Sequence, residues 1–333
     1  MSTPHSAPTK VLAAVAALSL SLGLSACGGS QAATTEEGVS SVSYGGQTIL
    51  PDLVFRGEDW GEPYSVDIEQ IRFSSGSEAF EALLSGEANV SNGGSGRLIT
   101  IAAQRPEAIS LIAKWQYGGS RYSVLTTEDS PIDQPSDLRG KTIAVDNGSG
   151  AYTLFLVWLE QNGLSLQDVT VLQTKIGDIG AALQAGSADV GIAWEPTAST
   201  LVSKGLAKRL DTLDSAGESP NFLIADKEWA EDNREALVAF LRAAVDVGEE
   251  ITNDPKSAGQ IASDVSAAEG VETDPEVLAE ALTYIKMEPQ IDEPALDELS
   301  SLAQEMVDQK KIEAVPDFAP LVDNSYLEEA LEQ

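Results

Sequence analysis

The sequence predicts an α/β fold of two similar lobes, and an internal repeat is the first observation that points to it. Residues 82–90 (ALLSGEANV) return as ALQAGSADV at 182–190, with Ala, Leu, Gly, Ala and Val in matching places. Both copies stand in the same predicted series of strand, loop, helix and strand, which requires parallel pairing through a crossover. The chain has 333 residues, of which 42% are apolar, and this is enough for two packed cores.

The first repeat unit begins with a predicted strand. VDIEQIRF at 66–73 alternates apolar and polar residues, and SSGS at 74–77 is typical of a turn. A helix follows, because EAFEALLSGE places its apolar residues on one face and ends near Gly86. The short strand ANV and the loop SNGGSG at 91–96 complete the unit.

Two more units of this kind follow. KTIAV at 141–145 predicts a strand, which the turn DNGSG joins to an apolar helix at 151–161. VTVLQT at 169–174 predicts the next strand, and a helix ending near Gly186 leads to the strand ADVGIAW. The turn GSGAYT is not a dinucleotide-binding fingerprint, because Thr153 stands at its last position and no acidic residue ends a following strand about twenty residues on.

The loops that follow these strands are rich in Gly, Ser and Asn. In open parallel sheets, ligands bind beyond the carboxyl ends of the strands. A Gly- or Ser-rich turn that opens a helix also presents unpaired N–H groups and the positive end of the helix dipole. We therefore expect SSGS, SNGGSG, DNGSG and WEPT to line one cleft between the lobes, a typical site for a small molecule.

The N-terminus has the features of an export signal. A lysine precedes the apolar run VLAAVAALSLSLGL, which is too short to span a bilayer comfortably. The sequence LSAC that follows resembles a lipobox, in which the cysteine becomes the lipidated first residue of the mature chain. We expect a lipoprotein signal peptide at 1–26, lipidation at Cys27 and a flexible tether at 27–38.

Composition excludes several classes of function. The formal net charge of −33, without clusters of Lys or Arg, disfavours nucleic acids and anionic membrane surfaces as partners. The one cysteine is Cys27 and the one histidine is His5, so the mature protein would hold neither a free thiol nor an imidazole. Nucleophiles activated by histidine, and metal sites built on His or thiolate, are therefore excluded. We expect a protein that is not an enzyme and that carries no metal and no cofactor.

Three segments carry a resemblance to a known family. They are SPIDQPSDLRGKTIAVDNGSG at 130–150, ALQAGSADVGIAWEP at 182–196 and the C-terminal pattern of 221–333. Together they resemble the substrate-binding lipoproteins of ABC importers, in the branch that handles nitrate, sulfonates, taurine and thiamine-pyrimidine precursors. The resemblance covers nearly the whole chain from residue 39 on. It implies a periplasmic-binding-protein type II fold, in which two α/β lobes close around a ligand.

The resemblance also implies boundaries and partners. Lobe 1 would comprise 39–125 and 222–333 and lobe 2 would comprise 126–221, with crossover segments near 124–129 and 217–223. The protein would be a monomer, held by its lipid on the extracytoplasmic face of the cell membrane. It would deliver its ligand by lobe closure to a permease with its ATPase.

The candidate ligand contacts lie in the predicted loops and beside the first crossover. Helix capping explains Ser75 or Ser77 and Ser95 as well as ligand contact does, whereas for Ser149 we favour ligand contact. Trp115 and Tyr117 fit a core as well as a cleft wall, and we expect Trp194 to form a stacking wall of the cleft. Arg121 suits an oxyanion or a surface carboxylate, and Glu195 suits a polar anchor or a hinge salt bridge. The candidates are Gln47, Ser75, Ser77, Asn92, Ser95, Trp115, Tyr117, Arg121, Asn147, Ser149, Tyr152, Trp194 and Glu195.

These residues leave the charge of the ligand open. Helix starts and Arg121 favour a small anion such as a sulfonate, because salt screens the distant net charge over about 8 to 10 Å. Glu195 would repel nitrate but suits taurine or a pyrimidine with amino groups. We rank a sulfonate or taurine-like ligand before a thiamine-type pyrimidine and nitrate. An alternative from another class is a ligand-sensing lipoprotein coupled to a membrane signalling protein. A synthase similar to the fungal thiamine-pyrimidine enzymes is disfavoured, because those enzymes consume a histidine and the mature chain would have none.

Overall fold

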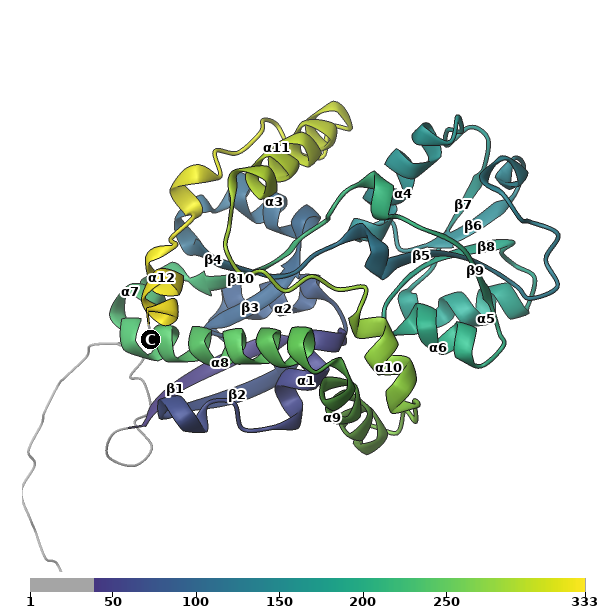
Figure 1. Ribbon diagram of the computed structural model, residues 1–333. Coiled ribbons are helices and arrows are strands. Elements are labelled where there is room, and N and C mark those ends of the chain that lie inside the picture. Colours follow the sequence, from purple (N-terminus) through teal and green to yellow (C-terminus); the bar gives the residue numbers. More distant parts are fainter. Residues whose placement is uncertain (1–38, 333) are drawn as a thin grey trace, which may run out of the picture. The chain divides into compact units, whose positions relative to one another are not determined.

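The computed structural model describes residues 39–332, which form two five-stranded sheets with helices on both faces of each (Figure 1). The sheet of lobe 1 has the order β2-β1-β3-β10-β4, and the sheet of lobe 2 has the order β7-β6-β8-β5-β9. The strands of lobe 1 are β1 (Ser40–Gly46), β2 (Val66–Arg72), β3 (Val90–Gly94), β4 (Ile109–Gln116) and β10 (Asn221–Asp226). Those of lobe 2 are β5 (Tyr122–Thr126), β6 (Thr142–Val145), β7 (Thr170–Gln173), β8 (Val190–Trp194) and β9 (Lys208–Thr212).

The two sheets share one plan. In lobe 1, β1 pairs in parallel with β2 and β3, and in lobe 2, β6 pairs in parallel with β7 and β8. Beside them lies an antiparallel strand, β10 between β3 and β4, and β5 between β8 and β9. The predicted fold class of two α/β lobes is confirmed, and the sequence repeat falls on equivalent helices and strands of the two lobes.

Helices cover both faces of the lobe 1 sheet. On one face α1, α8, α9, α10 and α12 surround a core, and on the other face α2, α3 and α11 surround a second core. Successive side chains of β10 point to opposite faces of the sheet, so Leu223 packs in the first core and Phe222 in the second. The helices are α1 (Leu50–Gly57), α2 (Gly76–Ser85), α3 (Ser95–Gln104), α7 (Lys227–Asp232), α8 (Arg234–Asn253), α9 (Pro255–Ala268), α10 (Pro275–Leu282), α11 (Glu293–Asp308) and α12 (Ser325–Leu331).

Lobe 2 is covered in the same way with fewer helices. α4 (Gly150–Gln161) packs on one face of its sheet, around Phe155 and Trp158. α5 (Ile179–Gln184) and α6 (Thr197–Ser203) pack on the other face. The helix expected at 151–161 is therefore present and begins one residue earlier.

The chain changes sheets between β4 and β5, and again between β9 and β10. We call residues 117–121 the first crossover and residues 213–220 the second crossover. The first crossover lies earlier than the expected 124–129, because β5 is a buried strand that pairs with β8 and β9 of lobe 2. The boundary expected at residue 125 therefore cuts through a strand of lobe 2. Residues 221–226 form the buried strand β10 of lobe 1.

The signal peptide, the lipidated Cys27 and the tether that the sequence predicts lie outside the described residues. Within residues 39–332, no helix combines the length and the apolar character needed to cross a membrane. In the same part of the chain, no group of three His, Cys, Asp or Glu side chains is placed to hold a metal ion.

Candidate functional site

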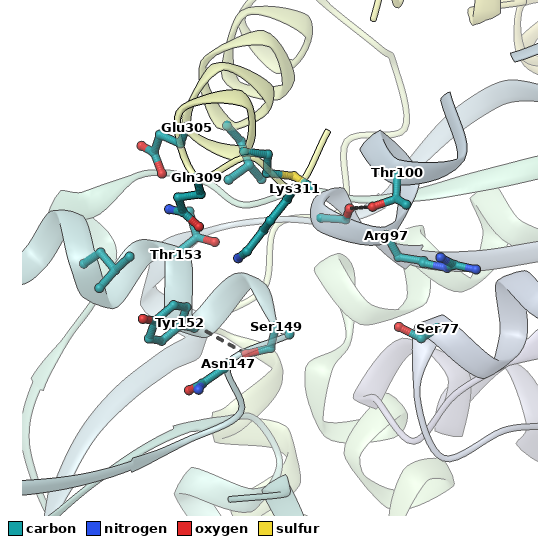
Figure 2. Close-up of a pocket in the computed structure, with 15 residues that line it drawn as sticks. Ser77, Arg97, Thr100, Asn147, Ser149, Tyr152, Thr153, Glu305, Gln309 and Lys311 are labelled. Carbon is teal, nitrogen blue, oxygen red and sulfur yellow. Dashed lines mark hydrogen bonds between the residues drawn. The ribbon is translucent and has the colours of Figure 1, made fainter. Parts of the chain in front are cut away.

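A cavity of about 220 Å³ lies where the starts of α2, α3 and α4 meet (Figure 2). Ser77 of α2, Gly96 of α3 and Ser149 before α4 line it together. The remaining side is formed by α11 and the chain just after it, including Glu305 and Lys311. The cavity thus combines both lobes with a late segment of the chain.

Local sequence explains why three helices begin at this place. The Ser75 hydroxyl caps α2 by accepting a hydrogen bond from the Glu78 N–H at 3.3 Å, and Ser149 caps α4 by accepting one from the Tyr152 N–H at 3.4 Å. α3 begins after Gly94, directly at the end of β3. The first N–H groups of a helix have no acceptor within the helix, and the helix dipole is positive there. The three starts therefore make the cavity favourable for an anion.

Two cationic side chains line the cavity. Figure 2 shows Lys311 pointing from the chain after α11 towards Tyr152 and Ser149. The Arg97 guanidinium points away from Lys311, because it pairs with Glu81 of α2. Lys311 is therefore the cation best placed to meet a bound anion.

One acidic residue also lines the cavity. Burial, followed by the nearby charges of Glu160 and Asp308, raises the pKa of Glu305. These effects disfavour its ionised form. Glu305 is therefore the acidic side chain that a bound anion would meet in this cavity.

Four predicted ligand contacts line this cavity together: Ser77, Asn147, Ser149 and Tyr152. Arg97 and Lys311 also line the cavity but are not among the contacts predicted from the sequence. Arg97 ends the loop SNGGSGR, so its place at a helix start was available as a signal. For Lys311 no local signal exists, because it reaches the cavity through the fold of the C-terminal region.

Gln47, Asn92 and Trp115 belong to a buried network instead. The Gln47 Nε2 donates to the Asn92 Oδ1 at 2.7 Å, and the Asn92 Nδ2 donates to the Asp52 Oδ2 at 2.9 Å. The Trp115 Nε1 donates to the Asp52 Oδ1 at 2.7 Å. Asn92 was expected in a loop, but β3 continues through Gly94 because it pairs with β10, and this turns the Asn92 side chain inward.

Arg121 and Ser95 join the two crossovers to α3. The buried Arg121 Nη2 donates to the Ser219 carbonyl oxygen at 2.6 Å and to the Asn221 Oδ1 at 3.1 Å. The Ser95 Oγ donates to the Pro220 carbonyl oxygen at 3.0 Å. Neither side chain lines the cavity, because both are engaged with the second crossover and the strand after it.

Tyr117, Trp194 and Glu195 also lie apart from the cavity. Tyr117 is buried in the first crossover, and Trp194 packs against the lobe 2 core beneath α4. The Glu195 Oε1 lies 2.7 Å from the Arg209 Nη2, and its Oε2 accepts a hydrogen bond from the Ser199 N–H at 3.0 Å. Burial raises the pKa of Glu195. Of the two roles expected for Glu195, ligand anchor or hinge salt bridge, the structure shows a salt bridge near the crossovers.

A second cavity of about 330 Å³ lies in lobe 1, between α8, α12 and residues 287–290. Its lining is mostly apolar and includes Trp115, Leu241 and Leu327. It shares no lining residue with the cavity at the helix starts. Of the predicted ligand contacts, Trp115 alone lines this second cavity.

Comparison with known proteins gives one matching family model. The model described as NMT1/THI5 like matches residues 64–258 of this chain. A protein of Bacillus subtilis (strain 168), provisionally described as an aliphatic sulfonates-binding protein, is 27% identical over 323 residues, which cover 93% of this chain and 94% of the relative. The taurine-binding periplasmic protein of Escherichia coli (strain K12) is 28% identical over 275 residues, which cover 78% of this chain and 84% of the relative.

Solved structures agree on the fold. The alkanesulfonate-binding protein SsuA from Xanthomonas axonopodis pv. citri, bound to MOPS, superimposes with a TM-score of 0.72. The alignment covers 85% of this chain and 98% of that chain at 20% identity. At this identity, the likeness supports the two-lobed fold and does not by itself carry the ligand over.

Proposed function

The chain belongs to the NMT1/THI5-like family of substrate-binding proteins, and from this premise we propose that it captures a small organic sulfonate for an ABC importer. Its relatives described above bind aliphatic sulfonates or taurine according to their descriptions.

The observation that carries the proposal is the meeting of three helix starts and Lys311 at one cavity. A sulfonate has three oxygens that accept hydrogen bonds, and the free N–H groups of a helix start are suitable donors. A nearby lysine adds a charge-assisted hydrogen bond. The hydroxyl groups of Ser77 and Tyr152 and the amide of Asn147 offer further donors around the same space.

The salt bridge of Glu195 changes the ranking of ligands. On the sequence alone, this carboxylate favoured a ligand with an amino group. Because Glu195 pairs with Arg209 at 2.7 Å, it no longer supports that preference. An alkanesulfonate therefore stands first, and taurine, with its ammonium group, would depend on Glu305 as its carboxylate partner.

The protein would deliver its ligand to a transporter in the membrane to which it is anchored. Ligand contacts from both lobes would stabilise a closed arrangement over an open one, and a permease with its ATPase would receive the loaded protein. We propose lipid anchoring through Cys27 on the extracytoplasmic face of the membrane, since the sequence up to this residue resembles a lipoprotein signal.

The test is a thermal-shift screen followed by calorimetric titration. Alkanesulfonates, taurine, nitrate, thiamine-type pyrimidines and amino acids are each added to the protein freed of carried-over ligand. A ligand at one hundred times its dissociation constant adds about 2.7 kcal/mol of stability, which moves the melting curve readably. We expect alkanesulfonates to raise the melting temperature most.

Lys311→Gln locates the binding site. Loss of an exposed charge-assisted contact should weaken sulfonate binding about fivefold. Lys310→Gln is the matched control, because it removes the same charge from the neighbouring residue, which does not line the cavity. Equal affinity of the two variants would refute this site, and the absence of any sulfonate-induced shift would refute the ligand class.

A further inference from the structure

A third segment of the chain runs beside the two crossovers. This segment, residues 283–286 between α10 and α11, pairs with the first crossover through two backbone hydrogen bonds. The Tyr117 N–H donates to the Lys286 carbonyl oxygen at 3.1 Å, and the Lys286 N–H donates to the Tyr117 carbonyl oxygen at 3.0 Å. The Ser120 Oγ donates to the Tyr284 carbonyl oxygen at 3.1 Å. The Lys286 Nζ lies 2.8 Å from the Glu218 Oε1 in the second crossover. The segment is thus tied to both crossovers.

This segment is anchored firmly in lobe 1 at its start. Leu278, Ala281 and Leu282 of α10 are buried in the core that α1, α8 and α9 form on one face of the lobe 1 sheet. α10 also packs against α9. Tyr284, two residues after α10, therefore moves with lobe 1.

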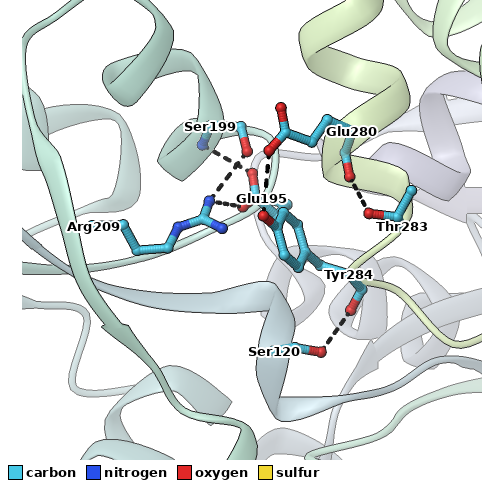
Figure 3. Close-up of polar contacts among 7 residues, drawn as sticks. All are labelled: Ser120, Glu195, Ser199, Arg209, Glu280, Thr283 and Tyr284. Atoms are coloured by element: carbon cyan, nitrogen blue, oxygen red, sulfur yellow. Dashed lines mark hydrogen bonds and ion pairs between the residues drawn. The ribbon is translucent and has the colours of Figure 1, made fainter.

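The same segment contacts lobe 2 through Tyr284 (Figure 3). The guanidinium carbon of Arg209, in β9, lies 4.5 Å from the centre of the Tyr284 ring, a cation–π contact. Glu195 and Ser199 hold Arg209 from within lobe 2, at 2.7 and 3.2 Å from its Nη2. α10 and α6 also pack against each other.

This contact lies on the other side of the crossovers from the ligand cavity. The cavity is lined by α2, α3 and α11, which cover one face of the lobe 1 sheet, and by α4 on the corresponding face of lobe 2. α10 and α6 belong to the opposite layers of their lobes. Figure 1 shows α11, α3 and α4 at the top and α10 and α6 at the bottom, with the chain crossing between the lobes in the middle. A rotation about the crossovers that narrows the cavity therefore separates Tyr284 from Arg209.

We propose that the Tyr284–Arg209 contact is a latch that holds the lobes in the wider arrangement and opposes closure over a ligand. Glu195 is a positioning residue in this latch, because its buried carboxylate fixes the guanidinium under the ring. The latch lowers ligand affinity without touching the ligand, since closing must first break it. The affinity part of this inference rests on the proposed function, whereas the effect on lobe arrangement does not.

The first test measures the lobes without ligand. Full-length protein with Cys27→Ser carries spin labels at Gln104→Cys in lobe 1 and Gln167→Cys in lobe 2, both exposed positions, and pulsed electron paramagnetic resonance gives their distance distribution. Tyr284→Leu should shift the distribution towards shorter distances. Tyr326→Leu is the matched control, because its ring lies 4.7 Å from the Arg234 guanidinium carbon within lobe 1. Tyr284→Phe keeps the ring and should behave like the unchanged protein.

The second test measures affinity for the sulfonate identified by the thermal-shift screen. Tyr284→Leu should bind it about two- to fivefold more tightly, the equivalent of one partly exposed cation–π contact, while Tyr326→Leu and Tyr284→Phe leave the affinity unchanged. A distance distribution that does not change in Tyr284→Leu, or weaker binding by this variant, overturns the latch. If no sulfonate binds, the proposed ligand fails while the distance measurement still decides on the latch.

Discussion

Asp52 is a buried carboxylate held by neutral donors. It accepts hydrogen bonds from the Tyr44 hydroxyl at 2.9 Å, the Trp115 Nε1 at 2.7 Å, the Gln47 N–H at 2.6 Å and the Asn92 Nδ2 at 2.9 Å. Burial raises its pKa, and these hydrogen bonds counteract the rise. The network fixes the ends of β1 and β3 next to the loops that lead towards the cavity at the helix starts.

Asp52→Asn tests this residue. An amide replaces one acceptor oxygen by a donor, so two of the four donors lose their partner while the shape is kept. We expect a loss of about 2 to 4 kcal/mol in the free energy of unfolding, measured by urea denaturation. Asp59→Asn, at an exposed position nearby, should change it by less than about 0.5 kcal/mol. Equal stability of the two variants would show that the network is not stabilising.

At the level of elements, the two crossovers are packed backbone against backbone. Gly119 in the first crossover lies so close to the carbonyl oxygens of Leu213 and Gly217 that a Cβ atom would overlap both. Buried Arg121 adds hydrogen bonds across the same contact. The crossovers therefore form one joint, and the absence of a side chain at Gly119 makes it possible.

Gly119→Ala should loosen this joint. The added methyl group meets backbone atoms, which cannot rotate away, so we expect the free energy of unfolding to fall by about 2 kcal/mol or more. Gly177→Ala is the control, because a Cβ there meets nothing within 4 Å. Chemical denaturation of both variants gives the comparison, and a Gly119→Ala protein as stable as the control would contradict the close contact.

Topology at this scale was only partly predictable. The units that contain β2, α2 and β3, and β7, α5 and β8, follow from periodicity and turn residues, which act locally. β5 and β10 were not predicted, because a short apolar run beside a crossover is compatible with a strand or with a helix. Their strand state is decided by pairing with neighbours far away in the sequence.

For the whole molecule, the net charge of −33 is the dominant feature. Self-repulsion of a highly charged chain disfavours the compact state, and salt screens it, with a Debye length of about 30 Å at 0.01 M and about 8 Å at 0.15 M. We expect the melting temperature to rise by about 2 to 4 °C over this range, measured by calorimetry. Choline chloride should act like sodium chloride, because screening is not specific to the cation. A melting temperature that stays constant or falls with salt would contradict this prediction.

The sequence by itself determined what depends on local order. Strand and helix periodicity gave the two lobes, and capping chemistry placed Ser75 at a helix start, where the structure has it. The parallel strands then bring Ser77, Asn147, Ser149 and Tyr152 to one cavity, as the position of loops after strands predicts.

Only the tertiary structure decided which way the remaining side chains face. Pairing of β3 with β10 turns Asn92 inward to Asp52, and Glu195 forms a salt bridge with Arg209 away from the cavity at the helix starts. Lys311 reaches the cavity because α11 packs against α3 from far along the chain. Local patterns fix elements and caps, whereas the partners of a side chain come from segments that the chain brings together only on folding.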